Sequence, residues 1–173
     1  IISINYLITN ELINDSNLIV DSFVNGSELT LDKEDGLYYI YFKVLDDSGT
    51  LTYRIYGYLL DLKAPDLVSE TYSNYNELKD YNNINVEISY LDNHFKTNDV
   101  YYIIDFYDSL ITKEEVITSN NLYKGQIIFN ELVNDGSYKI CFVSKDPLDN
   151  YSDLLCSDRL SLDTTPLSKE EVS

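Results

Sequence analysis

Short runs in which apolar and polar residues alternate follow one another along the chain, separated by clusters of Asn, Asp, Gly, Pro and Ser about every ten residues. Four such clusters lie at positions 25–27, 46–49, 134–136 and 146–150. Alternation with a period of two is the pattern of a half-buried β-strand, and many short strands joined by such turns are typical of a sandwich or barrel. We therefore expect an all-β protein.

The pattern D-G-x-Y-x-I-x-F occurs twice, at positions 35–42 and 135–142, an offset of 100 residues. Asp46 and Asp146 follow the two copies at the same offset, and each copy then continues through a loop into another apolar run. That run ends in L-D-L-K-A-P at position 65 and in L-D-T-T-P at position 166. Because proline removes a ladder donor and stiffens the chain, we interpret these segments as links between modules.

The repeat predicts two tandem β-sandwich domains, at residues 1–63 and 64–166, with residues 167–173 linking to a following domain. Seven strands are expected in the second domain, near 66–71, 84–91, 100–107, 115–118, 125–129, 137–145 and 154–162. Residues 113–119 could instead form a short turn. The first domain is short for a sandwich, so we expect it to be incomplete at its N-terminus. The chain has no Met and opens inside a strand-like run, so we also expect it to come from a longer polypeptide.

Alternation assigns the faces of the two repeated strands. Tyr, Ile and Phe at positions 38, 40 and 42, and at 138, 140 and 142, lie on one face and are expected to form the core. Lys43, Lys139 and Lys145 then lie on the opposite, solvent-facing side.

Cys141 and Cys156 are the only cysteines. If the second hairpin folds about Leu148 and Asp149, they oppose each other on its outer face, within reach of a disulfide bond. The alternatives are two free thiols or a metal or redox pair, although no third ligand is evident. Strict alternation from an outward Cys156 would also turn Leu160 outward, and the second copy is two residues longer here. We therefore expect a β-bulge near residues 157–159.

Charge narrows the range of partners. Acidic residues outnumber basic ones by 30 to 12, a net charge of −18, which disfavours nucleic acid because phosphate contacts need clustered Lys and Arg. No apolar run reaches transmembrane length, so no direct membrane insertion is expected. The sequence contains no G-x-S-x-G, H-E-x-x-H or phosphate-binding glycine loop, and we expect a protein that is not an enzyme.

The repeated D-G-x-Y-x-I-x-F, the aspartate after it and the closing L-D-x-x-P resemble the tandem immunoglobulin-like repeats of bacterial surface proteins. Positions 135–166 carry the closer match and positions 35–65 the second. Asp149 departs from the pattern, since the family often has Gly there. The resemblance implies two immunoglobulin-like β-sandwiches in a stalk or binding module of an extracellular, cell-surface or secreted protein. The alternative is a spacer or carbohydrate-binding module of a secreted polysaccharide-active enzyme.

The resemblance also bears on partners. Neighbouring immunoglobulin-like domains of the same chain are expected, and a host or cell-surface protein or a glycan could bind. Related repeats hold calcium where domains meet, and calcium takes six to eight oxygen ligands from such loops. The residues expected to supply them are Asp61, Asp92, Asp146, Asp149 and Asn150. The alternative interpretation is that Asp and Asn occur here because they form turns well.

Overall fold

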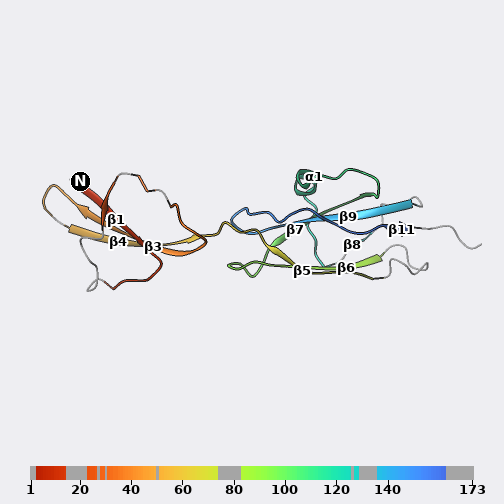
Figure 1. Cartoon of the computed structure of the whole chain (residues 1–173), viewed down its shortest axis with the longest axis horizontal. Coiled ribbons are helices and arrows are strands. Elements are labelled where there is room, and N and C mark those ends of the chain that lie inside the picture. Colours follow the sequence, from red (N-terminus) through yellow and green to blue (C-terminus); the bar gives the residue numbers. More distant parts are fainter. Residues whose placement is uncertain are drawn as a thin grey trace, which may run out of the picture. The chain divides into compact units, whose positions relative to one another are not determined.

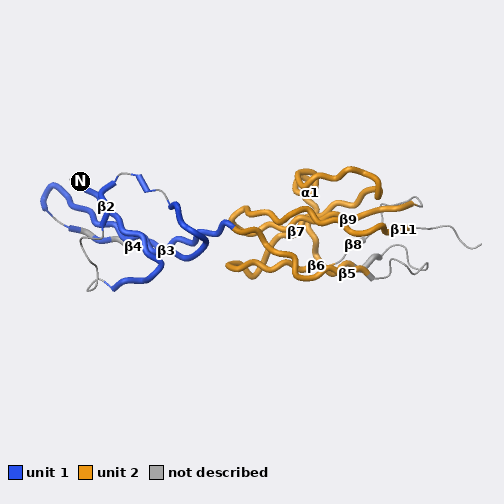
Figure 2. Tube along the Cα trace, viewed as in Figure 1, with its two compact units in different colours: residues 1–62 blue, residues 63–173 orange. Residues whose placement is uncertain are grey.

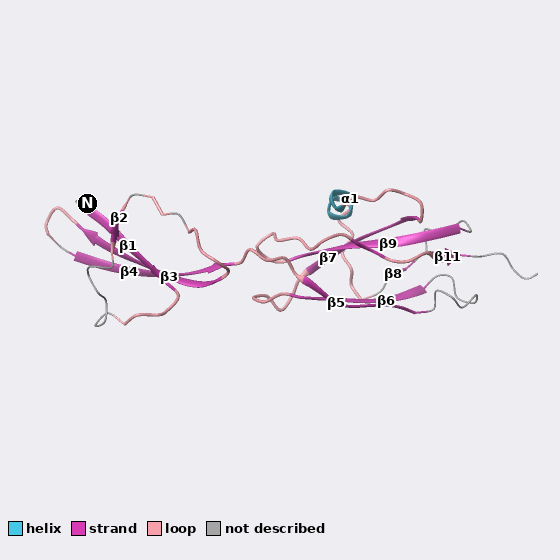
Figure 3. Cartoon of the chain, in the orientation of Figure 1, coloured by secondary structure: helices cyan, strands magenta, loops and turns pink. Residues whose placement is uncertain are grey.

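The protein is described by a computed structural model, which defines residues 3–14, 23–26, 28–29, 31–49, 51–73, 83–125, 127–128 and 136–162. The chain divides into two compact units, unit 1 from Ile1 to Leu62 and unit 2 from Lys63 to Ser173 (Figure 2). Strands dominate both units, and α1 is the one helix within the described residues (Figure 3). The all-β expectation is confirmed at this level.

Unit 1 contains one antiparallel sheet with the strand order β2-β1-β3-β4. Its strands are β1 (Ser3–Thr9), β2 (Val24–Asn25), β3 (Gly36–Leu45) and β4 (Leu51–Leu60). The hairpin of β3 and β4 pairs without interruption from Leu45 opposite Leu51 to Gly36 opposite Leu60. Ile40 and Tyr41, on opposite faces of β3, are the buried apolar residues of the described part of this unit.

The D-G-x-Y motif fixes the start of β3. The Tyr38 hydroxyl donates to the carbonyl of Glu34, four residues upstream, at 2.7 Å. Its ring lies over Gly36, where an added Cβ would stand 3.8 Å from the ring. Asp35 accepts the backbone N–H of Leu62 at 2.8 Å and so ties the end of β4 back to this corner. In sandwich domains a tyrosine placed in this way closes a corner between strands.

Unit 2 contains two antiparallel sheets (Figure 1). In one, β6 (Asn83–Leu91) lies between β5 (Asp66–Ser73) and β8 (Ile127–Ile128). In the other, β9 (Gly136–Lys145) pairs with β7 (Asp99–Phe106) on one side and with β10 (Leu155–Cys156) and β11 (Leu160–Leu162) on the other. Val86, Ile88 and Ile127 from the first sheet pack against Ile140, Phe142 and Leu160 from the second. The two layers therefore form a sandwich-like unit, and the predicted core face of β9 is confirmed.

The expected strand at 115–118 is wrong, because α1 (Lys113–Thr118) occupies this segment. The Thr112 side chain accepts the N–H of Glu115, and the Glu115 carboxylate accepts the N–H of Thr112, so the two residues form a reciprocal capping box. The fully buried Val116 then packs against Cys141 and Val143. α1 therefore covers the outer face of β9 at these two residues. The expectation that this face is open to solvent is wrong here.

The predicted bulge near residues 157–159 is confirmed. Cys156 pairs with Cys141, but Leu160 pairs with Tyr138, so one extra residue is absorbed between β10 and β11. Leu160 turns inward and is 3% exposed, although Cys156 faces outward. A second extra residue, which alternation did not predict, is absorbed between the Lys145–Tyr151 bridge and β10. Together the two bulges account for the two additional residues of the second copy.

Candidate functional site

The turns that follow β3 and β9 have the same local structure. In unit 1 the Asp46 carboxylate accepts the N–H of Ser48 at 2.9 Å, and its carbonyl accepts that of Gly49 at 3.2 Å. In unit 2 the Asp146 carboxylate accepts the N–H of Leu148 at 2.7 Å, and its carbonyl accepts that of Asp149 at 3.3 Å. The offset of 100 residues therefore holds for the hydrogen bonds of the turn as well as for the sequence.

The fourth position of both turns is left-handed. Gly49 has a φ of 82° and Asp149 a φ of 67°. Glycine adopts this conformation without steric cost, and Asp is one of the few other residues that tolerate it. Asp149 stands where the family that the sequence resembles often has glycine. This difference leaves the turn intact.

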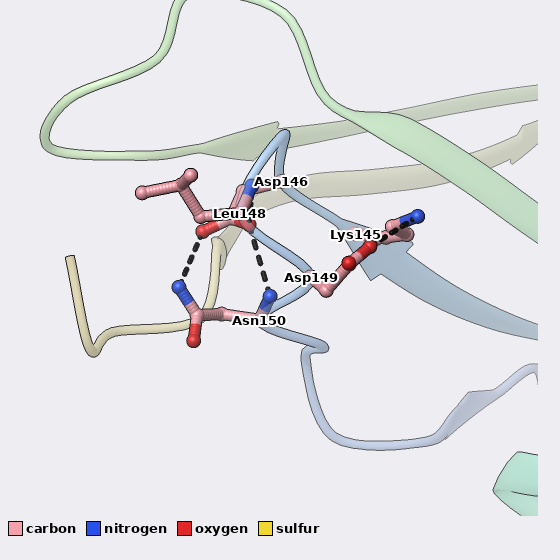
Figure 4. Close-up of polar contacts among 5 residues, drawn as sticks. All are labelled: Lys145, Asp146, Leu148, Asp149 and Asn150. Carbon is pink, nitrogen blue, oxygen red and sulfur yellow. Dashed lines mark hydrogen bonds and ion pairs between the residues drawn. The ribbon is translucent and has the colours of Figure 1, made fainter.

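Asp146 is the centre of the turn in unit 2. One of its carboxylate oxygens also accepts the N–H of Asn150 at 2.9 Å, and the other accepts the Asn150 side-chain amide at 2.8 Å (Figure 4). The residue is 2% exposed. Its charge is therefore held by backbone and amide dipoles, which replace much of the lost hydration.

Asp92, in the loop between β6 and β7, lies close to this turn. It is 7% exposed, and its carboxylate accepts the N–H groups of His94 at 2.7 Å and Phe95 at 2.9 Å. A carboxylate oxygen of Asp92 lies within 4.8 Å of one from Asp146. Two buried carboxylates at this separation repel each other, and a cation between them would remove that repulsion.

Two more of the predicted calcium ligands, Asp149 and Asn150, belong to the turn that follows β9. Asp149 points away from Asp146 and forms an ion pair with Lys145 at 2.5 Å, whereas the Asn150 side chain is hydrogen-bonded to Asp146 (Figure 4). Asp149 raises the pKa of Lys145 above its ordinary value, chiefly through this hydrogen bond. Asp61 belongs to unit 1 and directly follows β4. Calcium binding by this set stays a prediction. The hydrogen bonds of Asp92 and Asp146 are also those that the turn-forming interpretation expects.

The predicted disulfide between Cys141 and Cys156 is present. The two residues oppose each other across β9 and β10, and the bond closes a loop with a sequence separation of 15. Cys141 is fully buried beneath α1, whereas Cys156 is exposed. The bond joins β9 to the two-residue strand β10 between the two bulges.

Unit 1 has an apolar groove that sequence analysis did not identify. It has a volume of about 510 Å³ and lies on the face of the sheet that carries Phe42. Its lining comprises Ile4, Tyr6, Gly26, Glu28, Leu29, Phe42, Val44 and Tyr56. In unit 2 the equivalent face of β9 is covered by β6 and β8, and Phe142 is fully buried. The groove is open because, in the described part of unit 1, no second sheet packs on this face.

None of the protein-family models and none of the curated proteins compared with this chain matches it. Within the residues that the structure describes, no helix is both long enough and apolar enough to cross a membrane.

Proposed function

We propose that this chain is a non-catalytic structural or adhesive segment of a larger bacterial cell-surface or secreted protein, built from tandem immunoglobulin-like modules. One observation carries the proposal. The hairpin that begins with D-G-x-Y is built twice, with the same turn around Asp46 and Asp146. Duplication of a whole hairpin is what tandem modules produce, and repeated modules are a common way to build extended proteins.

The strand order of unit 2 supports the immunoglobulin-like part of the proposal. An immunoglobulin-like sandwich places its first, second, fourth and fifth strands in one sheet and its third, sixth and seventh in the other. In unit 2, β5, β6 and β8 form one sheet, and β7, β9 and the pair β10 and β11 form the other. This is that arrangement if α1 takes the place of the fourth strand and β10 and β11 count as a single bulged strand. In unit 1, the hairpin of β3 and β4 and the neighbouring strand β1 correspond to part of one of these sheets.

A stalk or an adhesive module must resist mechanical extension, and this can be measured. We suggest stretching the intact chain between handles at its two termini in a single-molecule force experiment. If both units bear load, the trace shows two unfolding events. Reduction of the disulfide should lengthen only the event of unit 2, by about 50 Å at about 3.5 Å per released residue, because the bond encloses a sequence separation of 15.

The double variant Cys141→Ser, Cys156→Ser is the control, since it should give the longer event without reductant. Extension of the whole chain without any force peak would contradict a load-bearing role. A single event for the whole chain would contradict the division into two modules.

The groove of unit 1 favours a second candidate, a glycan-binding module. Tyr6 and Tyr56 line it beside Phe42, and aromatic faces stack on sugars. Titration of the chain with soluble polysaccharides, followed by calorimetry, tests this candidate. Saturable binding that is lost in Tyr56→Ala and kept in Tyr53→Ala, a tyrosine of the same strand that does not line the groove, would support it. Identical behaviour of the two variants would count against it.

A further inference from the structure

The sheets of the two units carry the same residues on one face. The residues are a Tyr–Phe pair and an Ile–Ile pair, each directly opposed across two neighbouring strands. In unit 1 they are Tyr6 opposite Phe42 and Ile8 opposite Ile40. In unit 2 they are Tyr102 opposite Phe142 and Ile104 opposite Ile140. The register therefore makes β1 the counterpart of β7, just as the repeat makes β3 the counterpart of β9.

A backbone hydrogen bond beside this face is also shared. The N–H of Gly26 donates to the carbonyl of Ile4 at 3.4 Å. In unit 2 the N–H of Tyr123 donates to the carbonyl of Val100, the counterpart of Ile4, at 2.8 Å. The Tyr123 ring packs beside Phe142, with 6.2 Å between ring centres, whereas Gly26 has no side chain and lines the groove. The space that Tyr123 fills in unit 2 is therefore part of the groove in unit 1.

In unit 2 a second layer covers the shared face. Val86 and Ile88 of β6 pack against Ile140 and Phe142. β6 forms an antiparallel hairpin with β5, and residues 92–98 lead from β6 directly into β7. The covering hairpin is thus joined to the strand that corresponds to β1. Within the described residues of unit 1, no second sheet takes its place.

We propose that the groove of unit 1 is the docking face for a β-hairpin joined to the start of β1 and packed as β5 and β6 are packed in unit 2. This inference rests on the proposed function, because it treats the two units as copies of one module, and it identifies the layer that completes the first copy. A sheet with one apolar face is stable when that face is buried against another layer. A hairpin of the kind that buries Phe142 therefore suits the same face around Phe42.

The chemistry of the occupant follows from β6. Val86 and Ile88 are buried and Glu87 between them is exposed, so the occupant needs apolar side chains at alternate positions. The surface that it would cover is apolar as well: Ile4 is 36% exposed and Tyr56 is 58% exposed, and both line the groove. Docking removes this surface from water, which favours association. A free hairpin is marginally stable in water, so the occupant becomes ordered only where it docks.

Adding such a hairpin tests the proposal. A second copy of residues 66–98, which carry β5, β6 and the connection into β7, is fused directly ahead of Ser3 in place of residues 1 and 2. The connection into β1 then has the same length as the connection into β7. Amide exchange in β3 should slow by about tenfold or more, because burying even one Val or Ile side chain corresponds to more than this factor in an equilibrium constant. Exchange in β9 should be unchanged, which verifies that unit 2 is folded.

The matched control is the same fusion with Val86→Lys and Ile88→Lys in the added copy only. It keeps the length and the connection of the hairpin, but ammonium groups cannot be buried in an apolar groove without a partner. Amide exchange in β3 should therefore be as fast in this lysine fusion as in the parent chain.

A single thiol in the groove gives a second measurement. Both native cysteines are bonded to each other, so Val44→Cys adds the only free thiol, and Val44 lines the groove. Alkylation of this thiol should slow in the fusion and stay fast in the lysine fusion. Leu37→Cys is the control site, because Leu37 is 49% exposed on the opposite face of β3. Its thiol should react at the same rate in all three chains.

Three results would overturn the proposal. The first is amide exchange in β3, or alkylation of Val44→Cys, at the parent rate in the fusion. The second is equal protection by the lysine fusion. The third is polysaccharide binding that depends on Tyr56 and persists in the fusion, because the groove would then be open to a glycan. The single-molecule force experiment does not involve the groove, so it tests the load-bearing role independently.

Discussion

Ser152 and Ser157, five residues apart, hold the last strand of unit 2 against β9 by the same arrangement. The N–H of Ser152 donates to the carbonyl of Ser144, and its hydroxyl accepts the N–H of Ser144 at 2.8 Å. The N–H of Ser157 donates to the carbonyl of Ile140, and its hydroxyl accepts the N–H of Ile140 at 3.0 Å. Each hydroxyl thus replaces the backbone carbonyl that a bulge has moved out of the ladder.

Replacing Ser157 by alanine should lower the free energy of unfolding of unit 2 by about 1–3 kcal/mol, because it leaves the buried N–H of Ile140 without its acceptor. Ser152→Ala should have a similar effect through Ser144. Ser161→Ala is the control, since Ser161 is exposed and lies in the regular ladder of β11. Urea denaturation of the three variants measures the difference. Equal stability of Ser157→Ala and Ser161→Ala would show that the bulge does not depend on the hydroxyl.

Phe42 and Phe142 occupy the same position of the repeat in different surroundings. Phe142 is fully buried between the sheets of unit 2, and the rings of Tyr102 and Tyr123 lie 6.4 and 6.2 Å from its own. Phe42 lines the open groove of unit 1 and contacts Tyr56 with 5.9 Å between ring centres. Replacing this phenylalanine by alanine should therefore lower the stability of the two units by different amounts.

Phe142→Ala should destabilise unit 2 by about 3–5 kcal/mol, and Phe42→Ala should destabilise unit 1 by about half as much, because part of that ring remains in contact with water. Hydrogen exchange followed separately in β9 and β3 distinguishes the two units. Equal losses would show that the groove of unit 1 is filled in solution, either by other parts of the chain or by a second molecule.

Much of the fold follows from the sequence because the repeat constrains it twice. The spacing of Asp, Gly and Tyr locates both hairpins, and alternation along β9 identifies Ile140 and Phe142 as core residues. Folding the hairpin about Leu148 and Asp149 predicts the disulfide. The bridge at the turn is centred on Leu148 alone, and the bulge before β10 supplies the one-residue shift that brings Cys156 opposite Cys141. The inward turn of Leu160 could also be inferred, since two extra residues must be absorbed somewhere between fixed ends.

Other features escaped the sequence analysis for identifiable reasons. Thr112 and Glu115 have the spacing of a capping box, but only Val116 and Ile117 follow as apolar residues, too few to show helical periodicity. The repeated Ser-Asp at 152–153 and 157–158 marks the two bulges, yet this signal is clear only once the pairing is known. The groove of unit 1 depends on which strands pack against Phe42, and no local pattern encodes that.

The capping box makes α1 sensitive to pH. Hydrogen bonds from the backbone and side chain of Thr112 lower the pKa of Glu115 below its ordinary value of 4.5. A carboxyl group whose pKa is lowered on folding contributes stability above its ordinary pKa and loses it as the pH falls through the lowered value. Protection of α1 against hydrogen exchange should therefore decrease in acid, below about pH 4.5.

Glu115→Gln should weaken this pH dependence and retain the helix, because glutamine can also complete a capping box. Glu114→Gln, in the same turn of α1, is the control and should leave the profile as in the parent. NMR titration of the amide of Thr112 gives a direct measure. An identical pH profile for Glu115→Gln and the parent would show that the Glu115 carboxylate does not hold the start of the helix.

The role of Asp146 separates the calcium hypothesis from the turn-forming interpretation. If calcium binds the folded protein through Asp146 and Asp92, it should raise the melting temperature, by an amount that corresponds to about 2.7 kcal/mol at a hundredfold excess over the dissociation constant. Asp146→Asn should remove this increment, since it removes a charge, but it should largely preserve the turn because asparagine also accepts the N–H groups of such turns. Asp146→Ala removes both the charge and the acceptor oxygens. It should lower the free energy of unfolding by about 1–3 kcal/mol even in chelator, because the N–H groups of Leu148 and Asn150 lose their acceptor.

Asp46→Asn is the matched control, because Asp46 forms the same turn in unit 1 and is not among the predicted ligands. This variant should keep any calcium-dependent rise in melting temperature that the parent shows. Thermal melts of the parent and the three variants, each in calcium and in chelator, decide the question. If the parent melts at the same temperature in both buffers, the calcium hypothesis is wrong. The buried carboxylate of Asp146 is then held by its own turn, and a penalty confined to Asp146→Ala would measure how much that turn contributes to the stability of unit 2.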